Sequence, residues 1–260
     1  MSLKICILAS GSSGNCIYAG TETTSILIDA GLSGRETIHR LELIERRPED
    51  VRAVCVSHEH SDHTAGLGVL HRRHKIPLYA NAGTVEALQR NPDFRDIPWS
   101  VFTNGSPFRI GDLVIEPFTV PHDAYDPVGF ILRAGDVRAG IVTDIGIPTT
   151  LVRERLKSCR VLVVESNHDE RLLQEAQRPW HLKQRIRGRQ GHLSNTAAAQ
   201  MVAELGAGEL EQVFLAHLSE ECNRHKLALE TFHDIFHRAG LSGVRVDLTY
   251  PDRISSVWAG

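Results

Sequence analysis

Short apolar stretches rich in β-branched residues recur along the chain, separated by glycine, proline and other turn residues. This pattern is typical of buried or half-buried strands. Strands are expected over residues 5–8, 25–28, 53–56, 113–119, 128–133, 138–143, 160–164, 212–216 and 244–248. Gly135 and Asp136 form a turn between the fifth and sixth of them, as in a β-hairpin.

Apolar residues repeat every three to four positions over residues 84–90, 149–157, 195–205 and 225–237, which predicts helices there. Ser194 suits the start of the third helix, and Gly206 and Gly240 suit the ends of the third and fourth. Strands dominate the first half, and strand and helix units follow. We therefore expect an α+β fold with two sheets and helices outside, not one doubly wound parallel sheet. No repeat or linker interrupts residues 1–260, which predicts a single domain.

Composition narrows the class of protein only slightly. The chain has 260 residues, 42% of them hydrophobic, a formal charge of -3 and a pI near 6.5, so a nucleic-acid partner would have to meet a local basic patch. Five cysteines without CxxC spacing argue against a disulfide framework or a Cys-type zinc site. No apolar run is long enough for a signal peptide or a bilayer span, so we expect a cytoplasmic protein with no membrane partner.

Imidazole and carboxylate groups follow four of the expected strands. These groups are His58, His60, Asp62 and His63 in SHEHSDH, His122 in TVPHD, Asp144 in VTDIG, and His217 in LAHLS. A solvated polar loop could explain one such run, but the repetition favours a metal site at one rim of a sheet. These ligand types suit Zn²⁺, Mn²⁺ or Fe.

The order and spacing of these residues resemble the motifs of the metallo-β-lactamase superfamily. The resemblance implies a four-layer αβ/βα sandwich with two divalent metal ions. One ion would be held by His58, His60 and His122, the other by Asp62, His63 and His217, and Asp144 would bridge them. Asp62 would also orient the attacking hydroxide. The superfamily cleaves lactams, thioesters, lactones and phosphodiesters, so the substrate class depends on other residues.

Two further stretches resemble tRNase Z, a phosphodiesterase of this superfamily. VLVVESNHD places Glu165 at a strand exit, and GRQGHLSNT places His192 just before an expected helix. In tRNase Z a glutamate and a histidine in similar positions together protonate the leaving oxygen. The resemblance implies the same role for Glu165 and His192, although Ser166 and Leu193 depart from that pattern.

The chain is most similar to the YycJ/WalJ (VicX) branch, through LASGSSGNC, SHEHSDHTAG, ESNHD, GHLSN and LAHLSEECN. That branch is associated with 5′-to-3′ exonuclease activity on double-stranded DNA and with mismatch repair. The resemblance therefore implies a nucleic-acid partner, double-stranded DNA with a 5′ end.

The segment RPWHLKQRIRGRQG contains five Lys or Arg residues and no acidic residue, and it leads directly to His192. A charge run is usually a solvated face, but this position favours contacts to phosphates, with Trp180 as a stacking surface. We expect Arg185, Arg187, Arg189 and Asn167 to bind substrate. The glycine-rich loop 9–15 is interpreted either as a hairpin turn or as a backbone site for a terminal phosphate.

The sequence is also compatible with two other functions. A small-molecule ester, thioester or lactone hydrolase would share the same metal ligands but would leave Glu165, His192 and the basic segment without a role. A non-catalytic metal-dependent binding protein would bind DNA and never cleave it. The native metal, DNA against RNA, polarity of digestion and oligomeric state are left open by the sequence.

Overall fold

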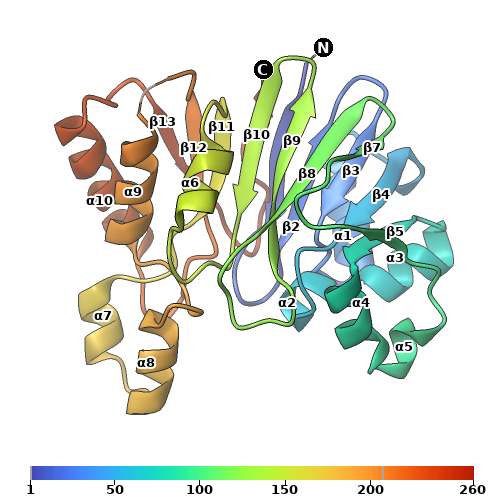
Figure 1. The fold of residues 1–260 in the computed structure, drawn as a ribbon, viewed down its shortest axis with the longest axis horizontal. Helices are drawn as coiled ribbons and strands as arrows, with labels where there is room; N and C mark the ends of the chain where they lie inside the picture. The colour runs from blue at the N-terminus through green and yellow to red at the C-terminus, as the bar shows by residue number, and fades with distance from the viewer. Residues whose placement is uncertain (1, 207) are drawn as a thin grey trace. The chain divides into compact units, whose positions relative to one another are not determined.

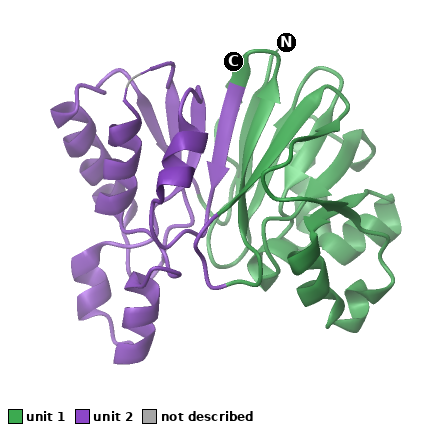
Figure 2. Cartoon of the chain, in the orientation of Figure 1, with its two compact units in different colours: residues 1–119, 124–137, 250–260 green, residues 120–123, 138–249 purple. Residues whose placement is uncertain are grey.

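The computed structural model describes residues 2–206 and 208–260. The chain divides into two compact units, shown in different colours in Figure 2. Unit 1 comprises Met1–Thr119, Ala124–Val137 and Tyr250–Gly260, and unit 2 comprises Val120–Asp123 and Arg138–Thr249.

Unit 1 contains a seven-stranded mixed sheet of order β14-β1-β2-β3-β4-β5-β6. Its strands are β1 (Lys4–Ala9), β2 (Cys16–Gly20), β3 (Ser25–Ile28), β4 (Val51–Cys55), β5 (Leu78–Asn81), β6 (Ser100–Phe102) and β14 (Trp258–Ala259). Neighbours from β14 to β3 are antiparallel, and those from β3 to β6 are parallel. The carboxyl ends of β3 and β4 therefore share one edge of the sheet.

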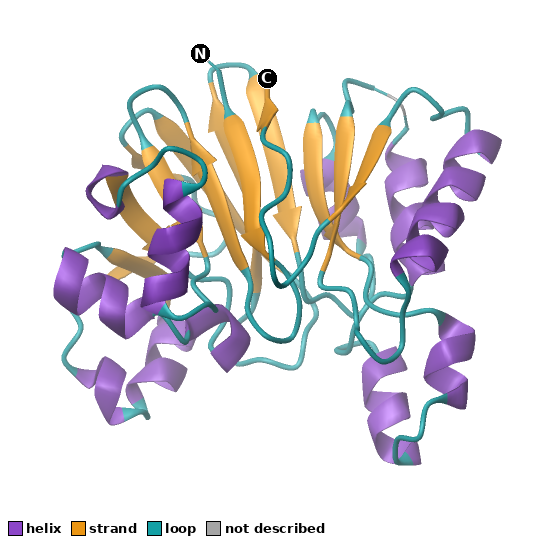
Figure 3. Cartoon of the chain, turned by 180° about the vertical axis from the view of Figure 1, so that it is seen from behind, coloured by secondary structure: helices purple, strands orange, loops and turns teal. Residues whose placement is uncertain are grey.

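Helices cover the strands of unit 1, and Figure 3 separates the two kinds of element by colour. They are α1 (Gly34–Glu42), the 3-10 turn η1 (Pro48–Asp50), α2 (Ser61–Thr64), α3 (Leu67–His74), α4 (Ala82–Gln89) and α5 (Pro92–Arg95). Apolar side chains of these helices, such as Leu41, Leu70 and Leu88, join Leu8, Leu27 and other strand residues in one buried cluster. Three antiparallel strands, β7 (Phe108–Ile110), β8 (Leu113–Thr119) and β9 (Val128–Ala134), complete the strands of this unit.

Unit 2 is built on four parallel strands, β10 (Val137–Val142), β11 (Val161–Glu165), β12 (Gln212–Ala216) and β13 (Arg245–Leu248). Its helices are α6 (Thr150–Leu156), α7 (Glu170–Glu175), α8 (Trp180–Arg187), α9 (Asn195–Leu205) and α10 (His225–Arg238). In Figure 1, α9 and α10 lie beside these strands, whereas α7 and α8 lie together beyond them. Since the strands are parallel, Asp144, Glu165 and His217 follow at one common edge.

Several strands agree closely with the sequence pattern. The expected strands 25–28, 113–119 and 212–216 match β3, β8 and β12, and the remaining ones overlap observed strands. The helix expected over 195–205 matches α9, with Ser194 at its N-cap accepting a hydrogen bond from the backbone N–H of Ala197. Residues 4–9 and 16–20 form an antiparallel hairpin around the glycine-rich loop, as one of the two interpretations expected.

Other boundaries were wrong by a few residues. The helix expected at 84–90 is α4, which begins at Ala82 because the Asn81 side chain caps it by accepting from the backbone N–H of Thr84. Strand β10 ends at Val142, one residue earlier than expected. None of the helices within residues 2–206 and 208–260 is both long and apolar enough to cross a membrane.

Candidate metal centre and catalytic pair

The motif SHEHSDH of unit 1 begins at the carboxyl end of β4 and continues into the short helix α2. His58 Nε2 lies 3.1 Å from His60 Nδ1, and His63 Nε2 lies 3.6 Å from Asp62 Oδ2. The His58 and His63 rings are stacked at a tilt, with centroids 4.1 Å apart. The sequence therefore brings all four predicted ligands of this motif together at one edge of the sheet.

Asp29, which follows β3, orients two of these histidines and was missed in the sequence. Its Oδ2 lies 2.7 Å from His63 Nδ1 and 2.8 Å from Ser57 Oγ, and Ser57 Oγ lies 2.9 Å from His58 Nδ1. Its Oδ1 accepts from the backbone N–H of Ser57 at 2.7 Å. A buried carboxylate accepts the Nδ1 proton of His63, which leaves Nε2 as the metal-binding nitrogen.

The glycine-rich loop is tied to the same motif through Asn15. The Asn15 backbone N–H donates to the Asp62 carbonyl at 2.7 Å, and its Nδ2 lies 3.3 Å from Asp62 Oδ2 and 3.1 Å from His63 Nε2. Asn15 Oδ1 accepts from the backbone N–H of Gly11 at 2.9 Å, which closes the loop. The buried Asn15 side chain thus holds the hairpin loop against two predicted metal ligands.

Gly31 lies where these loops cross. Its backbone N–H donates to the Asn15 carbonyl at 2.8 Å. A Cβ at this position would lie 1.6 Å from the Asp62 carbonyl oxygen and 2.6 Å from the Asn15 backbone nitrogen. The crossing therefore requires glycine for steric reasons.

In unit 2, three predicted ligands lie at the carboxyl edge of the parallel strands. Asp144 Oδ1 lies 3.8 Å from His122 Nε2 and 3.5 Å from His217 Nδ1. Asp144 and His217 have positive φ values of 26° and 54°, and Asp29 of unit 1 has a φ of 61°. Residues other than glycine rarely adopt a positive φ, and those that do are often found at functional sites. All three of these residues lie just after the end of a strand, where this conformation turns the chain.

Glu165 at the end of β11 connects this edge. Its Oε1 lies 2.6 Å from His192 Nδ1 and 3.0 Å from His217 Nδ1, and its Oε2 accepts from the backbone N–H groups of Ile145 and Leu193. The fully buried carboxylate therefore has four hydrogen-bond donors around it. Through these hydrogen bonds Glu165 holds three loops together, which carry Ile145, His192 and His217.

The charges of this cluster follow from its contacts. Burial opposes ionisation of Glu165, but the attraction of His192 and hydrogen bonds from His192 and His217 outweigh it and lower the pKa of Glu165 to about 2. Burial also opposes protonation of His192, but the charge and hydrogen bond of Glu165 raise the pKa of that imidazole. Glu165 is thus a carboxylate, and the Nδ1 atoms of His192 and His217 both donate to it.

A network of buried amides supports the His217 loop. Asn167 Nδ2 donates to the His217 carbonyl at 2.9 Å. Asn223 Nδ2 donates to the carbonyls of Ser166 and Asn167, and it exchanges hydrogen bonds with Asn195. The Asn167 amide, expected to contact substrate, therefore faces protein in this structure, and that expectation stays a prediction.

The basic segment 178–192 contains α8 and has mixed surroundings. Arg178 Nε donates to Glu221 at 2.7 Å, and Arg185 Nε lies 2.6 Å from Asp123 Oδ2. Arg187 and Arg189 are exposed, and neither forms an ion pair with any residue in the described part of the chain. The guanidinium groups of both arginines are thus accessible to solvent, and their contact with substrate stays a prediction.

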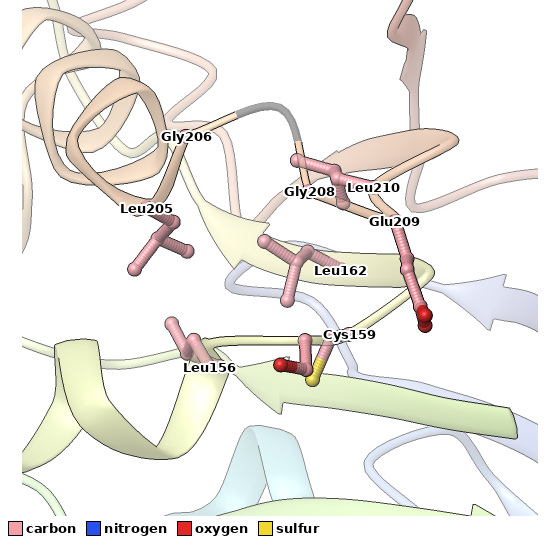
Figure 4. Close-up of a pocket in the computed structure, with 9 residues that line it drawn as sticks. Leu156, Cys159, Leu162, Leu205, Gly206, Gly208, Glu209 and Leu210 are labelled. Atoms are coloured by element: carbon pink, nitrogen blue, oxygen red, sulfur yellow. The ribbon is translucent and has the colours of Figure 1, made fainter. Parts of the chain in front are cut away.

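Figure 4 shows a small pocket of unit 2 between β11 and the end of α9. It is lined by Leu156, Cys159, Leu162, Leu205 and Leu210 among others, and its volume of about 20 Å³ admits about one water molecule. Leu162 lies at the start of β11, whereas Glu165 lies at its end. This pocket is therefore too small for a substrate and lies apart from the catalytic side chains.

The donor set in each unit fits a divalent metal ion. Imidazole and carboxylate ligands bind zinc at about 2.0–2.2 Å, so two ligand atoms on one ion lie about 3–4 Å apart. The pairs His58–His60 and Asp62–His63 in unit 1 and His122–Asp144 in unit 2 have separations of 3.1 to 3.8 Å. In unit 2, ligand-type atoms of Asp144, Glu165, His192 and His217 all lie within 4.8 Å of one another.

A fold of this kind with such histidine and aspartate clusters defines a class of metallohydrolases. Residues 24–217 match the family model described as the β-lactamase superfamily domain, and the chain belongs to this superfamily. It is 36% identical to exodeoxyribonuclease YycJ of Bacillus anthracis over 243 residues, which cover 92% of this chain and 91% of that protein. It is also 36% identical to exodeoxyribonuclease WalJ of Streptococcus pneumoniae over 255 residues, which cover 97% and 94%. Within the superfamily, the chain therefore belongs to the YycJ/WalJ family.

Solved structures agree on the fold. The metallo-β-lactamase fold protein YhfI of Bacillus subtilis matches with a TM-score of 0.76 and 17% identity over 100% of both chains. The short form of human tRNase Z matches with a TM-score of 0.66 and 16% identity, over 97% of this chain and 98% of that chain. The predicted α+β sandwich and the predicted superfamily are confirmed, and the protein is a metal-dependent hydrolase.

Proposed function

We propose that this protein is a two-metal phosphodiesterase that acts as a 5′-to-3′ exonuclease on double-stranded DNA and serves DNA repair in the cytoplasm. Both exodeoxyribonuclease relatives support this function, since they match nearly the whole chain. The observation that carries it is the contact of 2.6 Å between His192 Nδ1 and Glu165 Oε1. A hydrolase that expels a sugar alkoxide needs a general acid, whereas a thioester hydrolase expels a thiolate that needs no proton.

The ligand assignment is part of the proposal. His58, His60 and His122 hold one ion, Asp62, His63 and His217 hold the other, and Asp144 contacts both. Zn²⁺ and Mn²⁺ suit this donor set, and iron is also compatible with it. When bound, the two ions acidify water and neutralise the charge on the phosphate. We also propose that residues 1–260 act as one domain, because both relatives match nearly the whole chain.

His192 moves the proton in this proposal. Its Nδ1–H is held by Glu165, so its Nε2–H is the proton donated to the leaving 3′ oxygen. Glu165 stays ionised and stabilises the imidazolium, because the His192 charge and the hydrogen bonds from His192 and His217 outweigh the effect of burial. Asp62 orients the nucleophile, and its carboxylate is held for that task by Asn15.

Arg185, Arg187, Arg189 and Asn167 are proposed to contact substrate. Arg187 and Arg189 need no rearrangement to reach a phosphate. Arg185 would first leave Asp123, and Asn167 would first leave the His217 carbonyl. Such contacts are mainly electrostatic and would bind a DNA backbone of any sequence.

The test uses a duplex with a labelled 5′-phosphorylated end, incubated with the protein and Zn²⁺ or Mn²⁺. The 5′ label should be released with the first nucleotide while a 3′-labelled strand shortens stepwise, and Asp62→Ala protein prepared in the same way should leave the duplex intact. A 3′-labelled duplex of the same sequence establishes polarity. If parent and Asp62→Ala proteins leave DNA equally intact with every metal while the parent cleaves small esters or lactones, the nuclease function is wrong.

A further inference from the structure

Helix α8 is unusual because none of its residues is buried. Its first residue, Trp180, is 67% exposed, and the titratable residues of segment 178–192 are all Arg, Lys or His. A helix without a buried face gains little from packing, so its sequence is not explained by the core. Single exposed aromatic residues are common on protein surfaces, so Trp180 alone decides nothing.

The carboxyl end of α8 is fastened to the catalytic loop. The backbone N–H of His192 donates to the Ile186 carbonyl at 2.8 Å, and that of Gly191 donates to the Gly188 carbonyl at 3.0 Å. A Cβ on Gly191 would lie 2.1 Å from the Ile186 carbonyl oxygen. The helix end and His192 are therefore held at a fixed spacing within unit 2.

The other end of the helix is anchored as well. Lys183 Nζ donates to the Gln174 carbonyl, which joins α8 to α7, and Arg178 pairs with Glu221. Figure 1 shows α7 and α8 side by side as a two-helix arm. Trp180 thus occupies a fixed place on this arm at a defined distance from His192.

The length of α8 between Trp180 and Ile186 can be expressed in nucleotides. Ile186 and Trp180 are six positions apart in the sequence, which corresponds to about 9 Å along a helix axis. One nucleic-acid strand advances about 3.4 Å per nucleotide, so the helix covers about two to three nucleotides. Arg187 and Arg189 lie at the end nearer His192, and Trp180 lies at the far end.

We propose that the α7–α8 arm binds one DNA strand, with Arg187 and Arg189 on phosphates beside the scissile bond and Trp180 stacked on a base about two to three nucleotides away. This inference rests on the proposed nuclease function. Stacking requires a base that is not paired, so the arm favours duplex ends with a short single-stranded 5′ overhang over blunt ends. The unpaired segment would be led along α8 towards His192.

The experiment measures binding without cleavage, in the Asp62→Ala background. The DNA is a 5′-phosphorylated duplex with a three-nucleotide 5′ overhang, compared with the same duplex with abasic overhang sites and with a blunt one. Trp180→Ala should weaken binding of the overhang duplex about 5- to 150-fold, whereas Trp180→Phe should bind within about threefold of the parent. The abasic and blunt duplexes should show little of this difference. Leu151→Ala, which removes another exposed apolar side chain of unit 2, is the matched control.

Tryptophan fluorescence gives a direct signal of stacking. Of the other two tryptophans, Trp258 is only 6% exposed and Trp99 is partly buried against the core of unit 1, so quenching by the overhang duplex should be largely lost in Trp180→Phe. The proposed role of the arm would be wrong if Trp180→Ala and Leu151→Ala bound the overhang duplex with equal affinity and if Trp180→Phe kept the quenching.

Cleavage by protein with intact Asp62 separates the two proposals. If the parent digests DNA and Trp180→Ala digests it with an unchanged KM, the arm is wrong and the nuclease function stands. If quenching and affinity follow Trp180 but the parent never cleaves DNA, the nuclease function is wrong and the arm stands.

Discussion

Asp29 Oδ2 lies 2.7 Å from His63 Nδ1, with both side chains buried. This contact fixes the imidazole tautomer of His63 and leaves Nε2 for a metal ion. The carboxylate reaches the ring because the chain turns sharply after β3, where Asp29 has a φ of 61°.

Replacing Asp29 should therefore weaken metal binding. We expect Asp29→Asn to lower the affinity for Zn²⁺ about 10- to 100-fold, because an amide no longer stabilises the Nδ1–H tautomer. Competition with a chromogenic chelator measures this loss. Asp112→Asn is the matched control. The Asp112 carboxylate also accepts a hydrogen bond, from Thr21 Oγ1 at 2.8 Å, but it contacts none of the predicted metal ligands. Equal affinities in the two variants would assign Asp29 a purely structural role.

The hydrogen bonds of Asn15 predict that its replacement lowers both the stability of the protein and its affinity for metal, whereas replacement of another buried asparagine lowers the stability alone. Asn15→Ala removes hydrogen bonds to Asp62 and Gly11, so we expect the free energy of unfolding to fall by about 1–3 kcal/mol and the metal affinity to fall as well. Asn81→Ala should cost similar stability, because Asn81 is equally buried and caps α4, but should retain metal affinity. Chemical unfolding and metal titration of both variants test this contrast. Loss of metal in neither variant would mean that the loop does not position Asp62.

The contact between His192 and Glu165 predicts a dependence on the leaving group. His192→Ala should slow DNA cleavage about 100- to 10,000-fold while metal content stays nearly intact. The same variant should lose much less activity on a p-nitrophenyl phosphodiester of thymidine, whose leaving group needs no proton. Initial rates on both substrates decide the matter. Equal losses on the two would contradict a general acid.

Glu165→Gln should behave differently from His192→Ala. Glu165 also receives a hydrogen bond from His217 at 3.0 Å, so its replacement should lower metal affinity as well as proton transfer. Loss of activity on both substrates, together with reduced metal content by elemental analysis, is the expected result. A Glu165→Gln protein with full metal and a normal rate on the activated substrate would contradict this dual role.

Arg187 and Arg189 should contribute to the salt dependence of DNA binding. Each phosphate contact adds about one to the slope of log affinity against log salt concentration, so alanine at either position should reduce the slope by about one. Arg178→Ala should leave the slope unchanged, because Arg178 is paired with Glu221. Binding of the duplex over a range of potassium chloride concentrations tests this. A reduced slope for Arg178→Ala alone would place the phosphate contact elsewhere.

The cysteines should resist alkylation in the folded protein. All five are buried thiols outside any disulfide, and burial raises the pKa of Cys6 to about 11. A raised pKa means less thiolate, so at pH 8 roughly one Cys6 in a thousand is reactive, against about one in four for an unperturbed thiol. Labelling with iodoacetamide should be slow in buffer and fast in guanidinium chloride, as mass spectrometry would show. Rapid labelling of Cys6 in the folded state would contradict this burial.

The sequence revealed the site where ligands lie in local motifs. His58 to His63 follow one strand closely, and Glu165 and His192 each lie in a short stretch that resembles a known family. Asp29 was missed although it follows its strand as Asp144 does, because a single aspartate in LIDAG resembles an ordinary turn residue. Its partner His63 is distant in the sequence, and only the fold brings the two together.

Helices with weak apolar periodicity were also missed. Helix α8 has no buried residue, so no apolar stripe marked it. Helix α1 has a signal that was overlooked, since Ser33 caps it by accepting from the backbone N–H of Glu36. Periodicity reports burial, and elements stabilised by caps or tertiary hydrogen bonds escape it.

Gly31 shows how an inert position constrains the evolution of an active centre. It has no functional group, yet any side chain there would displace the backbone that carries Asp62. Random mutagenesis scored by activity should therefore reject every substitution at this position as firmly as substitutions of a metal ligand. Homologous chains can change the chemistry around the metal only if they keep this crossing of loops.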